Sequence, residues 1–219
     1  KASRGSGAAS VSQHRDSQWV TAGAISVAVL VSVGLARVEK QRKTIDAENE
    51  RLSELAKRLD GEIIVNQRKV LVITLGRNAT DRDLEQYRSC LDAMAINLSD
   101  SAVTDAGIRQ LNELGTLWFL DISRTDITGD GLSALTHLSR LTLNDTKVDD
   151  TSISNIVLLA SLNWLDLANT AISDAAVERL GELPALDQLD LTGTAVTGAG
   201  FRAWVDRGQL KWLTLSRTA

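Results

Sequence analysis

The stretch Leu165-Asp-Leu-Ala-Asn-Thr170-Ala-Ile-Ser-Asp174 decides the fold, because close copies of it recur through the rest of the chain. Each copy joins a Leu-x-Leu run to a small polar anchor residue, and a second short apolar run follows. Successive anchors are spaced by 24, 21, 24, 24 and 24 residues. They are Ser101, Thr125, Thr146, Thr170, Thr194 and Thr218. A fixed period in the twenties indicates stacked units of one strand and one helix.

The alternation within each copy predicts which side chains face the core. Strand side chains point alternately to the two faces, so the leucines of Leu-x-Leu should point inward. The anchor threonine should also turn inward, where its hydroxyl can satisfy backbone groups of the neighbouring turn. Three positions later a residue should cap the following helix; these caps are Thr104, Thr128, Asp149, Ser173 and Thr197. The inward face of the helices should carry Leu132, Leu135, Leu138, Val177, Leu180, Leu183, Leu186, Phe201 and Trp204.

These repeats resemble bacterial leucine-rich repeats of the LxxLxLxxTxITDxGLxxLxxL type. The resemblance covers residues 70–219, and residues 59–65 are similar to the short capping strand that opens many such arrays. It implies an α/β solenoid, an arc of about six strand–helix units of 24 residues. It also implies a protein-binding scaffold without a particular ligand. The polar cap that normally closes such arrays is not visible after Leu215, so the sequence is a segment of a longer one or something covers that edge.

Composition and motifs argue against several other functions. A net charge of −4 and a pI near 5.3 do not suit nucleic acid, which requires a basic face. The single cysteine, Cys90, is spaced like a core residue. Two GxGxxA stretches begin at Gly129 and Gly198, but both lie at the same repeat offset, so they belong to strand-to-helix turns and not to a dinucleotide site.

Neither catalysis, a cofactor nor a metal is expected. His14 lies in the N-terminal tail and His137 in a repeat linker, so no histidine pair has metal-ligand spacing. No set of nucleophile, base and orienting group is apparent. Aspartates on neighbouring strands could in principle share a hard cation, although such a column is more often a solvated face or a docking site.

The N-terminal third differs from the repeats. Residues 17–36 carry no charge and would span roughly 30 Å as a helix, which is the thickness of a bilayer core. Gly34-Leu-Ala36 leaves a cleavable signal peptide as an alternative. The expected division is a flexible tail (1–16), a transmembrane helix (17–37), a helical stalk (38–60) and the repeat domain (61–219). The expected localisation is a single-pass membrane protein, and basic residues after the span slightly favour a cytoplasmic repeat domain.

An apolar stripe with a period of seven residues runs along the expected stalk, at Val38, Ile45, Leu52 and Leu59. A self-associating coiled coil would need a second apolar seam, whereas Gln41 and Glu48 occupy interleaved positions. A charged stalk helix is therefore the preferred interpretation.

Three columns of side chains should lie on the concave strand face. Large residues form the first column, acidic and polar residues the second, and small residues the third. Exposed aromatic residues flanked by charges are typical interface anchors, although such rings could merely cover the strand backbone or pack on one another. The expected protein-binding residues are Phe119, Asp121, Arg140, Trp164, Asp166, Asp190 and Trp212.

The resulting hypothesis is a membrane-anchored scaffold for protein–protein interaction, an accessory subunit of a larger membrane complex. One alternative is a structural element that self-assembles through its stalk and its open solenoid end. A soluble receptor for a carbohydrate or peptide is a further alternative.

Overall fold

The computed structural model describes residues 35–204 and 210–218. The chain divides into two compact units, residues 1–48 and residues 49–219. The unit that holds the repeats thus begins at Asn49, inside the segment 38–60 that the sequence suggested as a stalk.

The described part of the first unit is helical from residue 35 to residue 48. Its side chains are mostly exposed, and Leu35 and Val38 are 65% and 63% exposed. The Thr44 hydroxyl donates to the carbonyl oxygen of Lys40, one turn earlier.

The structure corrects the expected membrane localisation. Nowhere in residues 35–204 and 210–218 is there a helix with both the length and the apolar character needed to cross a bilayer. The helix at residues 35–48 carries Arg37, Lys40, Arg42 and Lys43, and charged side chains are costly in hydrocarbon. Residues 17–34 of the expected span lie outside the described residues.

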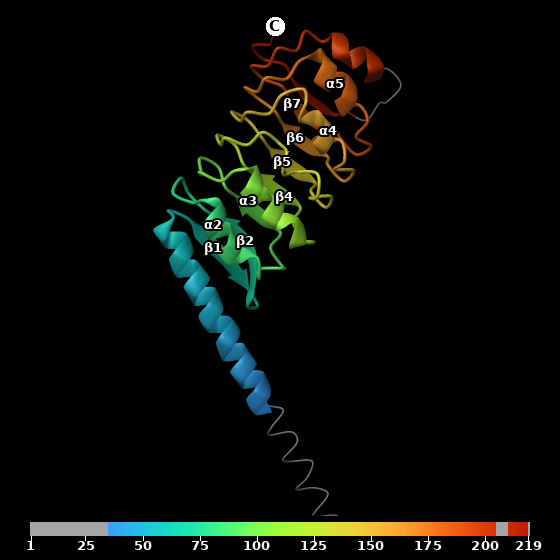
Figure 1. Cartoon of the computed structure of the whole chain (residues 1–219). Coiled ribbons are helices and arrows are strands. Elements are labelled where there is room, and N and C mark those ends of the chain that lie inside the picture. Colours follow the sequence, from blue (N-terminus) through green and yellow to red (C-terminus); the bar gives the residue numbers. More distant parts are fainter. Residues whose placement is uncertain (1–34, 205–209, 219) are drawn as a thin grey trace, which may run out of the picture. The chain divides into compact units, whose positions relative to one another are not determined.

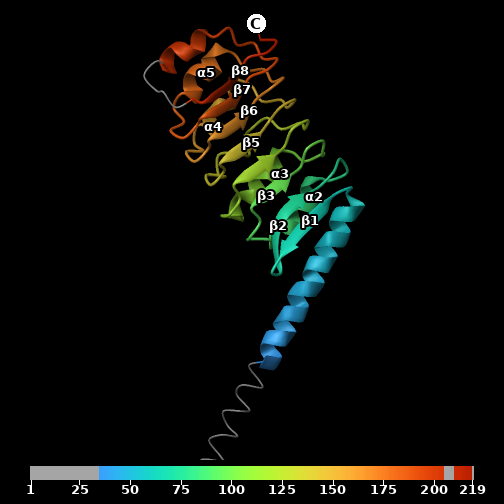
Figure 2. The same cartoon turned by 180° about the vertical axis from the view of Figure 1, so that it is seen from behind.

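One sheet runs through the second unit, and its strands follow one another in sequence order (Figures 1 and 2). The first two strands are antiparallel, and each later strand pairs in parallel with the one before. The strands are β1 (Glu62–Asn66), β2 (Lys69–Thr74), β3 (Ala95–Asn97), β4 (Phe119–Asp121), β5 (Arg140–Thr142), β6 (Trp164–Asp166), β7 (Gln188–Asp190) and β8 (Trp212–Thr214).

The leucine pattern sets the register of this sheet. Leu120, Leu141, Leu165 and Leu189 pair with one another in series on adjacent strands. Their side chains are at most 3% exposed, so they form one layer of the core. The repeat solenoid and its inward leucines are therefore as expected from the sequence. At β8 the equivalent residue, Leu213, is 39% exposed.

Short helical segments return the chain between strands, and Figures 1 and 2 show α4 and α5 on the same side of the neighbouring strands. The segments are α2 (Asp81–Leu84), η1 (Glu85–Tyr87), α3 (Asp105–Arg109), η2 (Gln110–Glu113), α4 (Ile153–Ile156), α5 (Asp174–Leu180) and η3 (Ala199–Trp204). Phe201 and Trp204 are only partly buried against the core, and the Trp204 indole donates to the carbonyl oxygen of Val177 at 2.8 Å.

The repeat between Thr125 and Thr146 has no helix, contrary to expectation. Leu132, Leu135 and Leu138 are buried there, but they lie on successive turns in which each backbone N–H donates to the carbonyl three residues earlier. The shortening of this repeat from 24 to 21 residues accounts for the difference. Turns closed every three residues bring a leucine inward at each step and use fewer residues than a helix with its connections.

The predicted helix caps are confirmed in part. Thr104 and Ser173 each accept a hydrogen bond from the backbone N–H two residues later, at the starts of α3 and α5. Thr128 opens the helix-free repeat, and Thr197 precedes the 3₁₀ helix η3. Asp149 does not cap an α-helix either, because α4 begins after Ser152.

The anchor threonines turn inward as predicted, and each bonds within its own repeat. The hydroxyl groups of Thr125, Thr146 and Thr194 donate to the carbonyl three residues earlier at 2.6, 2.6 and 2.7 Å. Thr170 makes the same contact with Leu167. The residue before each anchor is in the left-handed region, for example Arg124 with φ 54°.

Helical residues 49–58 pack against the first repeats. Leu52, Ala56 and Leu59 are 1%, 0% and 8% exposed and belong to the continuous core. The Tyr87 hydroxyl donates to the carbonyl oxygen of Leu52 at 3.2 Å. Two residues of the seven-residue stripe, Leu52 and Leu59, are thus explained by burial in the core and are not available for a coiled-coil seam.

Candidate functional site: the strand face of the repeats

The residues expected to bind a partner protein lie in two columns that run side by side across the sheet. Phe119, Arg140, Trp164, Gln188 and Trp212 occupy paired positions on five adjacent strands. The next column, paired in the same way, contains Asp121, Thr142, Asp166, Asp190 and Thr214. The sequence therefore predicted both columns in register, and their role in binding stays a prediction.

The aromatic side chains of the first column differ in whether they contact other side chains of the protein or are exposed to solvent. The guanidinium carbon of Arg140 lies 5.4 Å from the ring centroid of Trp164, a cation–π arrangement. The ring of Phe119 lies 6.0 Å from that of Trp118, and the two planes are tilted by 51°. Trp212 is 71% exposed. The alternative in which rings pack on neighbours applies to Phe119 and Trp164, whereas Trp212 remains open to solvent.

The aspartates of the second column have a local structural role. One carboxylate oxygen of Asp121, Asp166 and Asp190 accepts a hydrogen bond from the backbone N–H two residues later, at 3.0, 2.9 and 2.8 Å. Asn97 makes the same contact with Ser99. Such Asx turns end the strand and orient the carboxylate. Within the described residues, the second oxygen of each of these aspartates has no hydrogen-bond partner, so it can accept one from a ligand.

Asp166 has the most perturbed environment of this face. Burial raises the pKa of its carboxyl group, and the negative charges of Asp190 and Asp121 raise it further, while the N–H of Ala168 acts in the opposite direction. Desolvation and neighbouring charges of the same sign both disfavour the ionised form. A cationic group placed beside Asp166 and Asp190 would relieve this repulsion.

Thr142 belongs to the second column, which was expected on the exposed strand face, but it is buried at 8% exposure. It stands between Asp121 and Asp166 in the same column, so its shorter side chain is flanked by two longer ones. The acidic column is therefore interrupted at β5.

Two large apolar residues beside this face were missed by sequence reasoning. Met94 and Trp118 immediately precede β3 and β4 and are 43% and 38% exposed. The backbone N–H of Trp118 donates to the carbonyl oxygen of Met94 at 2.9 Å, so they are neighbours in adjacent repeats. The signal was present in the alignment, because the same position in later repeats is polar: Ser139, Asn163, Asp187 and Lys211.

The glycines of the GxGxxA stretches are used within the solenoid. The backbone N–H groups of Gly129 and Gly131 donate to the carboxylate of Asp105 at 3.0 and 3.2 Å. Gly198 and Gly200 donate in the same way to Asp174. These donors are directed at the preceding repeat and are not free to hold phosphates.

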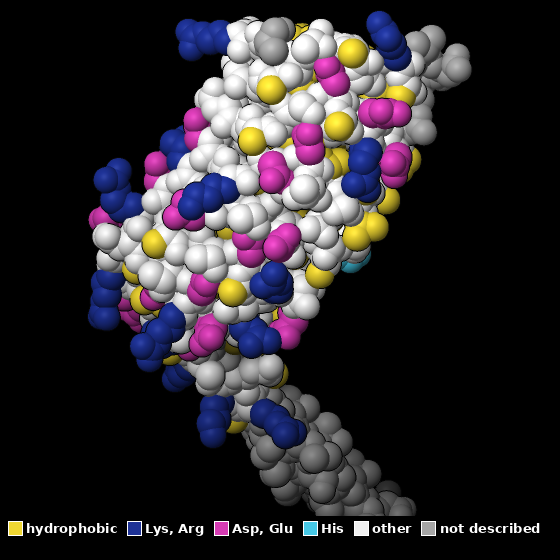
Figure 3. Space-filling view, turned by 45° about the horizontal axis from the view of Figure 1, so that its top comes forward, with side chains coloured by type: hydrophobic (Ala, Val, Ile, Leu, Met, Phe, Trp, Pro, Cys, Tyr) yellow, Lys and Arg dark blue, Asp and Glu magenta, His cyan; other side chains and the backbone are white. Residues whose placement is uncertain are grey.

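Charge is mixed on the surface shown in Figure 3, where Lys and Arg are interspersed with Asp and Glu. That face carries no basic stripe of the kind that tracks a nucleic acid backbone. In the described part of the chain, no three His, Cys, Asp or Glu residues are grouped as metal ligands would be. Cys90 is buried, as its spacing predicted.

Comparisons with known proteins give likenesses of fold. No family model and no curated protein matches the sequence. An internalin C2 structure from Listeria monocytogenes aligns at 22% identity and a TM-score of 0.49, over 60% of this chain and 55% of that one. Another internalin from that organism, inlF, aligns at 20% identity and a TM-score of 0.46, over 61% and 44%. A pollen receptor kinase 3 structure aligns at 16% identity and a TM-score of 0.49, over 72% and 79%. The chain spans about half the length of the two internalin structures.

Proposed function

We propose that this protein is a scaffold for protein–protein interaction and that it serves as an accessory subunit of a larger assembly. The partner would lie on the strand face of the repeats, against the columns that start at Phe119 and Asp121. The observation that carries the proposal is the strand pairing that sets Trp164 and Trp212 in one column of the strand face, beside the column of Asp166 and Asp190. A tryptophan left in water on a sheet face contributes little to folding, whereas tryptophan is enriched among residues that dominate binding.

The proposed contact combines apolar and electrostatic recognition. Trp164 and Trp212 are two strands apart in one column, so they lie roughly 10 Å apart along the sheet. Asp166 and Asp190 lie beside them with one carboxylate oxygen free in each. A partner segment with apolar side chains flanked by Lys or Arg is complementary to this pattern.

A comparison of single variants tests this proposal. In capture experiments with the full chain, Trp164→Ala and Trp212→Ala should weaken partner binding, since truncating an anchoring tryptophan typically costs at least about 2 kcal/mol. Asp190→Asn should weaken it less and should reduce its salt dependence. Unchanged melting temperatures for the three variants would separate lost binding from lost folding.

Arg179→Ala is the matched control, because Arg179 is exposed in α5, away from the strand columns. Capture should be unchanged in this variant. If Arg179→Ala removed capture and the tryptophan variants kept it, the protein would dock through its helical side and the proposed face would be wrong.

A further inference from the structure

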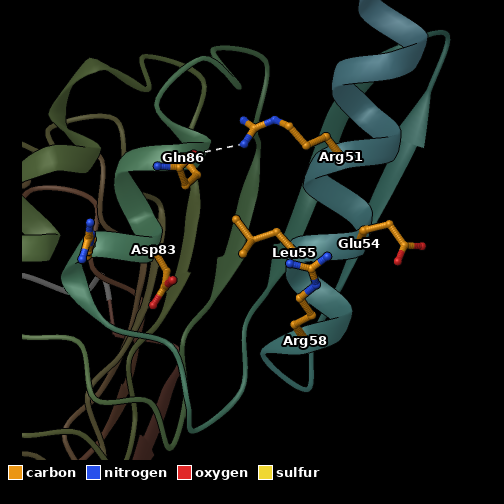
Figure 4. A pocket seen from close by; sticks show the side chains of 7 residues that line it. Arg51, Glu54, Leu55, Arg58, Asp83 and Gln86 are labelled. Atoms are coloured by element: carbon orange, nitrogen blue, oxygen red, sulfur yellow. Dashed lines mark hydrogen bonds between the residues drawn. The ribbon is translucent and has the colours of Figure 1, made fainter.

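A cavity of about 490 Å³ lies between helical residues 49–58 and the α2–η1 segment (Figure 4). Arg51 and Arg58 from the helix and Arg82 from α2 contribute to its lining. Pockets of roughly 300–1,000 Å³ are of the size in which proteins hold small molecules. Three guanidinium groups at one cavity are unexpected in a chain whose net charge is −4.

The two acidic residues of the lining are already engaged by other groups. Asp83 accepts hydrogen bonds from the backbone N–H and the hydroxyl of Thr80 at 2.9 and 2.7 Å. Glu54 pairs with Lys57 at 3.1 Å, and Figure 4 shows its side chain directed away from the α2–η1 segment.

The arginines are engaged to different degrees. Arg51 donates to the side-chain oxygen of Gln86 at 3.1 Å. Neither Arg58 nor Arg82 has a hydrogen-bond or ion-pair partner among residues 35–204 and 210–218. A guanidinium group presents a rigid fork of donors that matches the oxygens of a carboxylate or a phosphate. Two such forks at this cavity are therefore available to an anion.

The lining also has an apolar part. Leu55 is four residues after Arg51 and three before Arg58, so all three lie on one face of the helix. Figure 4 shows the Leu55 side chain between the two arginines and directed toward the α2–η1 segment. It is half-buried and packs against the core with part of its surface.

We propose that this cavity binds a small organic acid. The carboxylate or phosphate of the ligand pairs with Arg58 and Arg82, and its apolar part lies on Leu55. The site is separate from the strand face, and the capture of a protein partner does not depend on it.

Titration of the full chain with three matched probes tests the proposal. Phenyl phosphate carries both recognition elements, inorganic phosphate carries the anion alone, and phenol carries the ring alone. Phenyl phosphate should bind more tightly than either, as followed by isothermal calorimetry and by NMR shifts of arginine side-chain N–H groups. Benzoate in place of phenyl phosphate distinguishes a carboxylate from a phosphate preference.

Variants at the cavity provide the second arm. Arg58→Gln and Arg82→Gln should each weaken phenyl phosphate binding by about tenfold, because each removes a charged hydrogen-bonding partner. Arg109→Gln removes one positive charge from an exposed residue that is not part of the lining, so it should leave binding unchanged. Arg58 and Arg82 are both exposed, so the two variants should keep the melting temperature of the unaltered protein.

Several results would overturn the proposal. One is the absence of phenyl phosphate binding. Another is equal weakening of binding by Arg109→Gln. A third is inorganic phosphate binding as tightly as phenyl phosphate, which would indicate general attraction of anions. Binding of a hexaglutamate peptide without binding of phenyl phosphate or benzoate would also overturn it, in favour of an acidic protein segment. Loss of protein capture in the tryptophan variants bears only on the strand face.

Discussion

The carboxylate of Asp174 accepts hydrogen bonds from both the backbone N–H and the hydroxyl of Thr197, which lies 23 residues later in the next repeat. The same kind of contact joins Asp81 to Thr104, Asp105 to Thr128 and Asp150 to Ser173. Each aspartate stands at the turn before a helical segment or in its first residues. A carboxylate that satisfies donors of the following repeat therefore holds neighbouring repeats together along the turn side of the sheet.

Asp174→Asn should make the stability of the protein less dependent on pH on the acidic side. The hydrogen bond from the Thr197 hydroxyl, with those from the N–H groups of Gly200, Thr197 and Gly198, lowers the pKa of Asp174 from its usual value of 3.8. A lowered native pKa gives stability that is present above pH 3.8 and is lost as the pH falls through the native pKa. In urea unfolding, the Asp174→Asn variant should have a lower free energy of unfolding than the unaltered protein at pH 7. This difference should disappear below pH 3.8.

Asp130→Asn is the control for that experiment, because Asp130 is exposed and follows Gly129 in the repeat that lacks an aspartate at the joining position. It should change the unfolding midpoint little at pH 7. A gap between Asp174→Asn and the unaltered protein that stays constant down to pH 2 would contradict the role given to the carboxylate.

Asp166→Asn should have the opposite dependence. The pKa of Asp166 is raised, chiefly by burial, so folding is favoured by its neutral form below pH 3.8, and this advantage is lost as the pH rises through the native pKa. Asparagine can still accept the N–H of Ala168 but carries no charge. The variant should therefore gain stability relative to the unaltered protein as the pH rises from 3 to 7, measured by thermal unfolding. A gain that shrinks over this range would contradict the assignment.

Gly131→Ala and Gly200→Ala should destabilise the fold by roughly 1–3 kcal/mol. A Cβ at these positions would lie 2.6 Å from the backbone oxygen of Asp105 and 2.4 Å from that of Asp174. Backbone atoms of an adjacent repeat cannot move aside without disturbing its pairing. Gly115→Ala meets nothing within 4 Å and should be tolerated. The unfolding midpoints of the three variants in chemical denaturant test this prediction. Equal midpoints would contradict the close approach of the neighbouring backbone to Gly131 and Gly200.

Thr170→Val should cost about 1–3 kcal/mol, because it keeps the shape but removes the hydroxyl that bonds the carbonyl of Leu167. Thr142 is buried and is unsuitable as a surface comparison. Thr136 is exposed, and its hydroxyl has no hydrogen-bond partner within the described residues, so Thr136→Val should stay within about 0.5 kcal/mol. Similar urea midpoints for the two variants would mean that the hydroxyl contributes nothing.

Leu52→Ala should cost about 2–5 kcal/mol, since Leu52 is 1% exposed in the core that begins the repeat unit. Val38→Ala, at 63% exposure in the same seven-residue stripe, should be close to neutral. A fragment of residues 49–219 should fold with the same midpoint as the full chain. If Val38→Ala were the more damaging change, the stripe would be a self-association seam after all.

Repetition explains why so much of the fold could be predicted. Leu120, Leu141, Leu165 and Leu189 hold the same position in four of the six aligned copies, so an error of one residue in any strand would have been visible as a mismatch with the others. The columns through Trp164 and Asp166 followed from the same alignment. Alternation within a strand then fixed which side chains shared a face.

The features that were missed depend on contacts between elements rather than on pattern. Leu52 and Leu59 recur every seven residues, and this spacing fits an exposed seam and a buried helix face equally well. The loss of a helix after Thr128 follows from chain length in one repeat, where three fewer residues leave room only for turns. The burial of Thr142 depends on the longer side chains of Asp121 and Asp166 beside it.

The contacts between aspartate and the following threonine also bear on how such an array can change in length. Four of the repeats have an aspartate whose carboxylate accepts hydrogen bonds from a backbone N–H and a hydroxyl of the next repeat. A repeat that has both this aspartate and the donors for the aspartate of the repeat before it can be duplicated or removed. Neither the carboxylate nor the donors would then lose a partner. The joint after the 21-residue repeat does not follow this rule, since Ser152 there donates its hydroxyl to the carbonyl oxygen of Thr128. Insertion or deletion of whole repeats should therefore be tolerated elsewhere in the array and resisted at that joint.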